Sequence, residues 1–198
     1  MKKVTFILAS SSPRRIGMLK EQGYLFKVIK PRCSEVACHI RGARGSALHN
    51  SKIKGLYVGK LCDNAVILSA DTVVVLNNRI LGKPKNVKDA LKMLKKLNNK
   101  THSVLTAYTV LAKNNGKIKI VDEKIVESKV HFGNFSDQDY IDYVKTKEPL
   151  DKAGAYAVQG LGARFVKEVK GSYSNVVGLP LFEVMNSLKK AGVKAPWK

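Results

Sequence analysis

The chain has few cysteines and no histidine pattern typical of a metal site. Its 198 residues include three cysteines, an odd number without CxxC spacing, and four histidines that form no HxxxH or HExxH pair. These counts argue against a disulfide framework and against the common zinc sites. We therefore expect Cys33, Cys38 and Cys62 to be reduced thiols.

Long hydrophobic runs are also absent. No apolar segment approaches the roughly 18 residues that a membrane-spanning helix needs. The first residues, MKKVTFILAS, imitate a signal peptide, since lysines precede an apolar run. That run covers only Val4 to Ala9, which is shorter than the hydrophobic region of a signal peptide. We expect a buried strand here, and a cytoplasmic protein without a membrane partner.

Acidic residues are scarce relative to basic ones. The chain has 36 Lys plus Arg and 15 Asp plus Glu, which gives a net charge of +21. Such a field attracts polyanions, including nucleic acids, acidic membrane surfaces and nucleotide phosphates. The lysines are spread along the chain, however, so solvated helix faces explain them as well as nonspecific nucleic-acid binding through a basic surface does.

The hydrophobic pattern alternates between strands and helices along the whole chain. It predicts an α/β protein with a mixed, twisted central sheet flanked by helices, and a single domain over residues 1–198. The expected strands cover residues 4–9, 24–30, 64–71, 102–112 and 117–132. The expected helices begin at residues 13, 45, 86, 136 and 180, and the first stops at Gly23, the second at residue 60 and the last near Gly192.

Several turn and cap residues support these boundaries. Ser12, Asn86 and Ser136 stand where helix N-caps are expected. Residues 72–82 are predicted to form a hairpin whose loop, Asn77-Asn78, tolerates the positive φ angles of a type I′ turn. In that register Leu76 pairs with Arg79.

The segment LASSSPRR places two arginines in the first turn of a helix. Cations are disfavoured there, because the helix N-terminus carries partial positive charge and free N–H groups. An anion would resolve the conflict, so Ser10, Arg14 and Arg15 predict a phosphate-binding turn. The alternative is a surface turn whose arginines point into water.

A second group of polar residues is predicted around the hairpin. We expect Asp71 at the carboxyl end of a buried strand, where open α/β sheets bind ligands. The hairpin register places Thr72 opposite Lys83, so an acid, a hydroxyl group and a lysine would meet. The carboxylate suits a divalent cation or a water molecule, and the lysine suits phosphate. A structural Asp–Lys pair is the alternative.

Three further polar residues stand in regions of weak pattern. Glu35 and Lys52 are isolated charges that local sequence alone would leave in solvent. Gln159 lies in a loop rich in small residues, and its amide is suited to a base edge because it both donates and accepts hydrogen bonds.

Taken together, six motifs resemble the Maf family of nucleoside triphosphate pyrophosphatases. LASSSPRR, ADTVV, LGKP, THSVLTA, DKAGAYAVQG and GSYSNVVGLPL occur in this order from residue 8 to residue 181. The resemblance implies an elongated, two-lobed fold with a central cleft, related to inosine triphosphate pyrophosphatases. It also implies hydrolysis of a nucleoside triphosphate to monophosphate and pyrophosphate with Mg²⁺ or Mn²⁺, and a homodimer.

The resemblance implies roles for individual residues. Asp71 matches the proton acceptor, which also lies near the metal. Arg14 and Thr72 match residues that influence substrate choice, and Gln159 matches the branch that prefers dTTP and UTP. Further polar residues match the lining of the cleft. These are Ser10, Glu35, Lys52 and Lys83.

The match is incomplete at some of these positions. Glu35 stands in CSE, where relatives more often have an Asp-Glu pair, and Lys52 stands in LHNSKIKG instead of a pattern closer to LAxxKA. Combining both lines of reasoning, we expect Asp71 and Glu35 to bind the metal. Arg14, Arg15, Lys52 and Lys83 would hold the phosphates. The competing hypothesis is a basic nucleic-acid-binding or cell-division regulatory protein, although no RRM, KH or zinc-finger signature is present.

Overall fold

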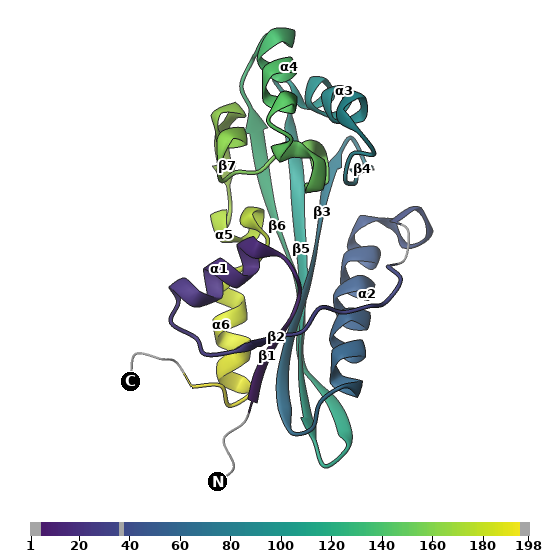
Figure 1. Cartoon of the computed structure of the whole chain (residues 1–198), viewed down its shortest axis with the longest axis vertical. Coiled ribbons are helices and arrows are strands. Elements are labelled where there is room, and N and C mark those ends of the chain that lie inside the picture. Colours follow the sequence, from purple (N-terminus) through teal and green to yellow (C-terminus); the bar gives the residue numbers. More distant parts are fainter. Residues whose placement is uncertain (1–4, 36–37, 195–198) are drawn as a thin grey trace. The chain divides into compact units, whose positions relative to one another are not determined.

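The computed structural model describes residues 5–35 and 38–194 and shows a mixed α/β protein (Figure 1). One seven-stranded sheet has the order β2-β1-β3-β5-β6-β7, and β4 pairs with β3 outside this path. The prediction of a mixed central sheet with flanking helices is confirmed. The strands are β1 (Thr5–Ala9), β2 (Lys27–Val28), β3 (Ala65–Leu76), β4 (Arg79–Leu81), β5 (Thr101–Asn114), β6 (Lys117–Phe132) and β7 (Val166–Lys170).

The helices are interspersed among these strands along the chain. No helix within the described ranges is long and apolar enough to cross a membrane. The α-helices are α1 (Pro13–Glu21), α2 (Cys38–Lys60), α3 (Val87–Leu97), α4 (Asp137–Lys145), α5 (Tyr173–Val177) and α6 (Leu181–Lys190). Three short 3₁₀ helices are η1 (Glu148–Asp151), η2 (Ala153–Ala155) and η3 (Leu161–Phe165).

The chain divides into two compact units, and β3, β5 and β6 contribute residues to both. The first unit comprises Met1–Asp71, Thr106–Val126 and Gly178–Lys198, and the second comprises Thr72–Leu105 and Glu127–Val177. Each unit has its own hydrophobic core. That all 198 residues form one domain stays a prediction.

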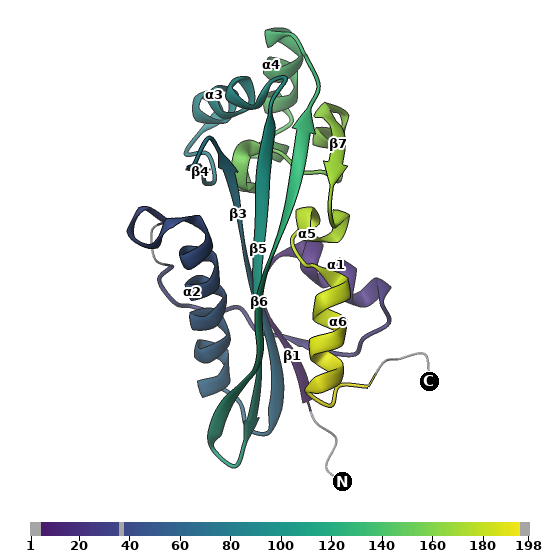
Figure 2. The same cartoon turned by 180° about the vertical axis from the view of Figure 1, so that it is seen from behind.

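In the first unit, β1 lies between β2 and β3 and is parallel to both. Helix α2 covers one face of these strands, and α1 and α6 cover the other, as Figures 1 and 2 show from opposite sides. The interior is aliphatic, because alternate residues of β1 and β3 meet the inner side of α2. This core contains Ile7, Ala9, Val58, Ala65, Ile67 and Leu111.

In the second unit, β3 pairs with β4 and β6 pairs with β7, both antiparallel. Helices α3 and α4 pack against each other (Figure 1). The core is rich in aromatic side chains. Tyr140 and Phe132 are fully buried, and the ring of Phe165 lies 4.9 Å from that of Tyr140 and 6.2 Å from that of Phe132.

The predicted turn and two of the predicted caps are confirmed. Asn77 and Asn78 have φ angles of 48° and 60°, and Leu76 pairs with Arg79. The Asn86 side chain accepts a hydrogen bond from the Asp89 N–H at 2.9 Å, and Ser136 forms a capping box with Asp139. Local sequence was sufficient for these features, since each depends on only a few neighbouring residues.

Other boundaries were predicted wrongly. The strand expected over 24–30 is only Lys27–Val28, and the helix expected from 45 begins at Cys38. Gly42 has non-helical angles (φ 64°, ψ 176°), so α2 consists of two stretches that meet there. The start of α1, in contrast, is confirmed, because Ser12 is its N-cap in an extended conformation and Pro13 is its first residue. The Ser12 side chain makes no capping hydrogen bond.

The strand expected to end at Asp71 continues to Leu76. The apolar residues after Asp71 extend the same strand, so Asp71 lies within β3 and not at its end. The predicted ladder position of Thr72 opposite Lys83 is also wrong. Pairing between β3 and β4 has the expected register but ends at Val74 and Leu81.

Candidate active site

Asp71 lies on β3 at a change of strand partner. The parallel pairing of β3 with β1 ends at Ser69, and its antiparallel pairing with β4 begins at Val74. The Asp71 side chain is buried, with 10% of its surface exposed. A buried carboxylate needs a charged or hydrogen-bonding partner, because desolvation of an unpaired charge costs several kcal/mol.

Lys54 of helix α2 provides that partner. Its Nζ lies 2.6 Å from Asp71 Oδ1 and 2.9 Å from Glu35 Oε1. Lys54 is itself buried, whereas the Glu35 side chain is 56% exposed. One ammonium group therefore brings together two carboxylates, one from a central strand and one from the segment before α2. The structure thus brings together Asp71 and Glu35, which were predicted to belong to one site.

Close packing of α2 on the sheet brings Lys54 to Asp71. The Ser69 hydroxyl donates a hydrogen bond of 2.7 Å to the backbone oxygen of Ser51, one helical turn before Lys54. The next residue, Gly55, has no side chain to separate the two elements, and a Cβ there would lie 2.7 Å from Ser69 Oγ. Ser69 and Asp71 point to the same side of β3, because they are two residues apart.

The structure does not bring Lys52, the predicted lysine, to these carboxylates. Lys52 is half-buried and lies two residues before Lys54 on α2, so the two side chains project in different directions. Lys54 was missed by sequence reasoning, although a signal exists. Buried positions on α2 recur with helical spacing, and Lys54 is one of them. They include Ala47, Ser51, Lys54 and Val58.

Arg15 is directed inward. Its Nε donates to the Gly178 oxygen at 2.8 Å, and its Nη1 donates to the Ala70 oxygen at 2.9 Å. Desolvation lowers the pKa of the Arg15 guanidinium, and the negative charge of Asp71 opposes that shift. Arg15 therefore holds the backbone on either side of the site, including the residue just before Asp71.

Ser10 and Arg14 flank Arg15 in the predicted phosphate-binding turn. Ser10 is buried, and its Oγ accepts hydrogen bonds from the Ser12 N–H at 3.1 Å and from Arg15 at 3.4 Å. Arg14 is half-buried at the first turn of α1. The geometry distinguishes the two arginines, because Arg15 donates to backbone oxygens. A phosphate-binding role for both stays a prediction.

Thr72, Lys83 and Gln159 belong to the second unit. Thr72 follows Asp71 on β3 and is half-buried, and Lys83 is exposed beyond the end of β4. Gln159 is exposed at the tip of a turn between η2 and η3. Roles for these three residues in a common site stay predictions.

The described residues contain no group of three or more His, Cys, Asp or Glu side chains that would enclose a metal ion. Glu35 and Asp71 nevertheless offer two carboxylates to a single positive charge, now that of Lys54. Mg²⁺ is commonly bound through one or two carboxylates together with substrate phosphates and water. The donor set therefore fits a divalent cation that arrives with a phosphorylated substrate. Cys33 and Cys62 are free thiols, and the Cys38 side chain lies outside the described residues.

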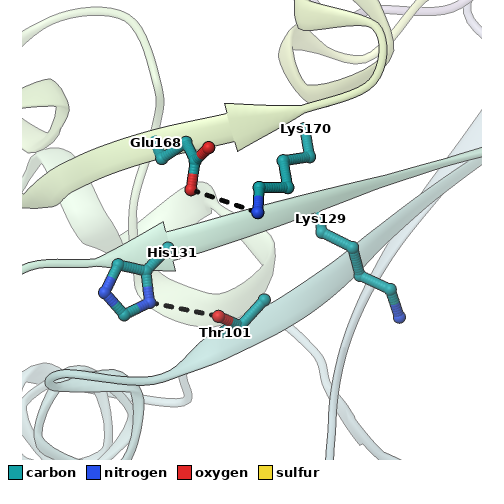
Figure 3. Close-up of a pocket in the computed structure, with 5 residues that line it drawn as sticks. All are labelled: Thr101, Lys129, His131, Glu168 and Lys170. Carbon is teal, nitrogen blue, oxygen red and sulfur yellow. Dashed lines mark hydrogen bonds and ion pairs between the residues drawn. The ribbon is translucent and has the colours of Figure 1, made fainter.

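A separate small pocket in the second unit contains none of the predicted site residues (Figure 3). The register pairs Lys129 with Lys170 and His131 with Glu168 across β6 and β7. Thr101 of β5 hydrogen bonds His131 at 3.1 Å, and Lys170 lies 3.8 Å from Glu168. The Thr101–His131 contact joins β5 to β6, whereas Glu168 and Lys170 lie two residues apart on β7. Such pairs are ordinary contacts of an exposed sheet surface.

Comparison with known proteins agrees with the motifs. The family model described as Maf-like protein matches residues 5–191. A protein of Dictyoglomus thermophilum named dTTP/UTP pyrophosphatase is 40% identical over 194 residues, covering 96% of this chain and 97% of its own. A protein of Caldicellulosiruptor saccharolyticus with the same name is 40% identical over 196 residues, covering 97% and 96%.

A fold comparison also finds the structure of a HAM1 protein from Coxiella burnetii. It covers 95% of this chain and 100% of the HAM1 chain, with a TM-score of 0.49 and 14% sequence identity. The sequence matches are far closer and extend over nearly the whole length of both chains. On that ground, the chain belongs to the Maf family.

Proposed function

We propose that this protein hydrolyses dTTP and UTP to the nucleoside monophosphate and pyrophosphate. The observation that carries the proposal is the buried Lys54 bridge between Asp71 and Glu35. It concentrates charged groups beside a strand segment where β3 changes partner. The name dTTP/UTP pyrophosphatase, carried by relatives that are 40% identical over nearly their whole length, supports the choice of substrate.

Asp71 is proposed to accept a proton from the attacking water. A general base must lie within hydrogen-bond reach of the proton that it accepts. Lys54 fixes the Asp71 carboxylate through Oδ1, which leaves Oδ2 as the oxygen proposed to take the proton. Arg15 supports this arrangement by holding the Ala70 carbonyl next to Asp71.

The phosphates are proposed to lie against the first turn of α1. Free N–H groups and the positive end of the helix dipole attract anions there, and Arg14 adds a charged group. As substrate binds, the Lys54 ammonium group would also interact with the phosphates. Lys52 and Lys83 stay candidate phosphate ligands on the basis of the family resemblance.

Glu35 and Asp71 are proposed to hold a divalent cation, Mg²⁺ or Mn²⁺. When bound, such an ion supplies charge neutralisation for the triphosphate. In the reaction, the water oxygen forms a bond to the α-phosphorus, and the bond from that phosphorus to the oxygen bridging the α- and β-phosphates breaks. Pyrophosphate carries away the bonding electrons, and the water proton passes to Asp71.

The base is proposed to be read by Gln159, with Thr72 contributing to substrate choice. A glutamine amide offers one acceptor and two donors, which complement the N3–H and carbonyl groups of uracil and thymine. Removal of such a contact costs about 1–3 kcal/mol, which would weaken selection of the base without abolishing hydrolysis.

The experiment is a panel of canonical and modified nucleoside triphosphates assayed for pyrophosphate with Mg²⁺, with Mn²⁺ and with a chelator. We expect the highest kcat/KM for dTTP, UTP or a modified pyrimidine, and loss of turnover with the chelator. Asp71→Asn should lose activity, and Asp63→Asn, at an exposed turn, is the control. Wild-type turnover by Asp71→Asn, or no pyrophosphate from any pyrimidine nucleotide, would refute the proposal.

Nucleic-acid binding is a second candidate function, and the net charge of +21 favours it. Binding through a basic surface weakens steeply as salt increases, because phosphate contacts release counterions. Fluorescence anisotropy with labelled single- and double-stranded DNA between 50 and 300 mM salt, about the range over which such complexes dissociate, tests it. Salt-dependent DNA binding by Asp71→Asn would show that nucleic-acid binding does not require hydrolysis. A homodimer and a cytoplasmic location stay predictions.

A further inference from the structure

Gln159 lies at the exposed tip of a turn whose base is buried. Tyr156, Ala157 and Val158 precede it and are at most 9% exposed, whereas Gln159 and Gly160 are exposed. Gly162, after the tip, is buried again. The turn over residues 157–162 therefore presents one amide side chain from a fixed support.

Glu148 holds the second half of this turn. Its Oε1 accepts hydrogen bonds from the Gly162 N–H at 3.0 Å and the Tyr143 hydroxyl at 2.9 Å, and its Oε2 accepts one from the Leu161 N–H at 3.0 Å. Desolvation opposes ionisation of Glu148, but the N–H groups of Gly162 and Leu161, the Tyr143 hydroxyl and the charge of Lys152 together lower the pKa of this carboxyl. The bonds are therefore made by a charged carboxylate, which strengthens them.

Tyr143 extends the network to the first half of the turn. Its oxygen is hydrogen bonded to the backbone N–H of Ala157, while its hydroxyl donates to Glu148. Tyr143 is buried, with 4% of its surface exposed. Residues on both sides of Gln159 are thus joined through two neighbouring side chains. We call Tyr143 and Glu148 the clamp.

Gly160, the residue after Gln159, lies close against Glu148 of the clamp. Gly160 has φ 84° and ψ −154°, a conformation that side chains disfavour. A Cβ at this position would lie 2.9 Å from Glu148 Oε2. The sequence Gln-Gly therefore allows the carboxylate to approach the backbone directly behind Gln159.

A fixed turn has a specific use for a glutamine that selects a base. A free amide rotates to present either its oxygen or its NH₂ group, so it would serve cytosine as well as uracil. Discrimination requires the amide to be held in one orientation. We propose that Glu148, with Tyr143, is a positioning residue that fixes the Gln159 turn and so sets selection for uracil and thymine over cytosine. This inference rests on the proposed function.

The test compares kcat and KM for UTP and CTP in Glu148→Gln, Gln159→Ala and the double variant. The ratio of kcat/KM for UTP to that for CTP should fall about tenfold in Glu148→Gln, since a hydrogen bond to the correct base is no longer aligned. The loss should appear as a higher KM for UTP, with kcat within threefold of wild type. The double variant should lose no more selectivity than Gln159→Ala alone, because both changes abolish the same contact between Gln159 and the base.

Further variants separate positioning from folding. Tyr143→Phe keeps the bonds from Leu161 and Gly162 to Glu148 and should lower the ratio less than Glu148→Gln does. It also tests the clamp if Glu148→Gln fails to fold. Asp142→Asn changes an exposed carboxylate next to Tyr143 and should leave the ratio unchanged. A purely structural effect would lower turnover of UTP and CTP equally.

The two proposals fail in different ways. If the wild-type protein releases pyrophosphate from neither UTP nor dTTP, the proposed function is wrong and this inference is wrong with it. If the wild type hydrolyses and selects UTP while Glu148→Gln and Tyr143→Phe keep its ratio, only the positioning role is overturned. Additive loss of selectivity in the double variant would also overturn that role.

Discussion

Lys54 Nζ lies 2.6 Å from Asp71 Oδ1, in a pair whose two side chains are about equally buried. The same nitrogen contacts the more exposed Glu35 at 2.9 Å. Removing one member of a buried pair leaves the other charge uncompensated, which is generally costlier than losing a surface ion pair. Loss of Lys54 would therefore leave the Asp71 carboxylate buried without its charged partner.

Lys54→Met is expected to reduce kcat/KM for UTP by about 100-fold. It removes the positive charge that lies between Asp71 and Glu35, the residues proposed to act on the triphosphate. Steady-state pyrophosphate release measures this loss. Lys60→Met, at the exposed end of the same helix, is the matched control. If Lys52→Met proves more damaging than Lys54→Met, the resemblance chose the correct lysine and the geometric assignment is wrong.

The choice between Lys52 and Lys54 illustrates what the sequence was able to predict. A lysine-containing helix was expected at this place, and motif spacing suggested Lys52. The buried stripe of α2 identifies Lys54, but that stripe contains serine and glycine as well as apolar residues, so its helical period is weak. The lysine that contacts Asp71 and Glu35 became apparent only with the packing of α2 on β3.

Arg15 and Arg14 are expected to differ although they are neighbours. Arg15→Gln should lower the free energy of unfolding by about 2–4 kcal/mol, because it removes charged hydrogen bonds to the Gly178 and Ala70 carbonyls. Arg14→Gln should change stability by less than about 0.5 kcal/mol and raise the KM for UTP. Urea denaturation and steady-state kinetics separate the two. Equal stability of both variants would contradict the structural role of Arg15.

Local features were predicted more successfully than long-range ones. The caps at Asn86 and Ser136 and the Asn77-Asn78 turn depend on short segments, and the structure confirms them. Asp71 was expected at the end of a strand over residues 64–71, with a separate hairpin over residues 72–82. The strand instead continues, since the following apolar run is also buried. The Glu148 clamp joins residues up to 14 positions apart without a periodic signal, so sequence pattern could not reveal it.

His102 is a buried histidine expected to make stability depend on pH. Its Nε2 lies 2.6 Å from the Tyr156 hydroxyl oxygen, and its Nδ1 has no hydrogen-bond partner in the described structure. Burial lowers the pKa of His102 from 6.5 to about 4. Between these values the unfolded chain binds the proton and the folded chain does not.

Stability should therefore be complete above pH 6.5 and fall as the pH decreases toward about 4. The contribution of this one group reaches on the order of 3 kcal/mol, because each pKa unit corresponds to about 1.4 kcal/mol. Urea denaturation at several pH values measures the slope. His102→Gln should reduce it, and His49→Gln, at a half-buried histidine of α2, should retain it. Identical slopes in wild type and His102→Gln would exclude the effect.

Gly55 and Gly17 provide a matched test of how closely α2 must approach β3. A Cβ on Gly55 would lie 2.7 Å from Ser69 Oγ and 2.9 Å from Leu111 Cδ1, whereas a Cβ on Gly17 of α1 has no atom within 4 Å. Ser69 is buried and hydrogen bonded to the Ser51 carbonyl, so it has little freedom to move. Gly55→Ala should therefore push α2 away from β3.

We expect Gly55→Ala to destabilise the protein by about 1–2 kcal/mol, because overpacking outweighs the better helix propensity of alanine. Gly17→Ala should stabilise it by about 0.5–1 kcal/mol, since only the propensity term applies. Thermal or urea unfolding gives both values. Gly55→Ala should also lower kcat, because Lys54 is the adjacent residue and would be displaced from Asp71. A Gly55→Ala protein as stable and active as Gly17→Ala would show that the Lys54–Asp71 pair does not depend on this close approach.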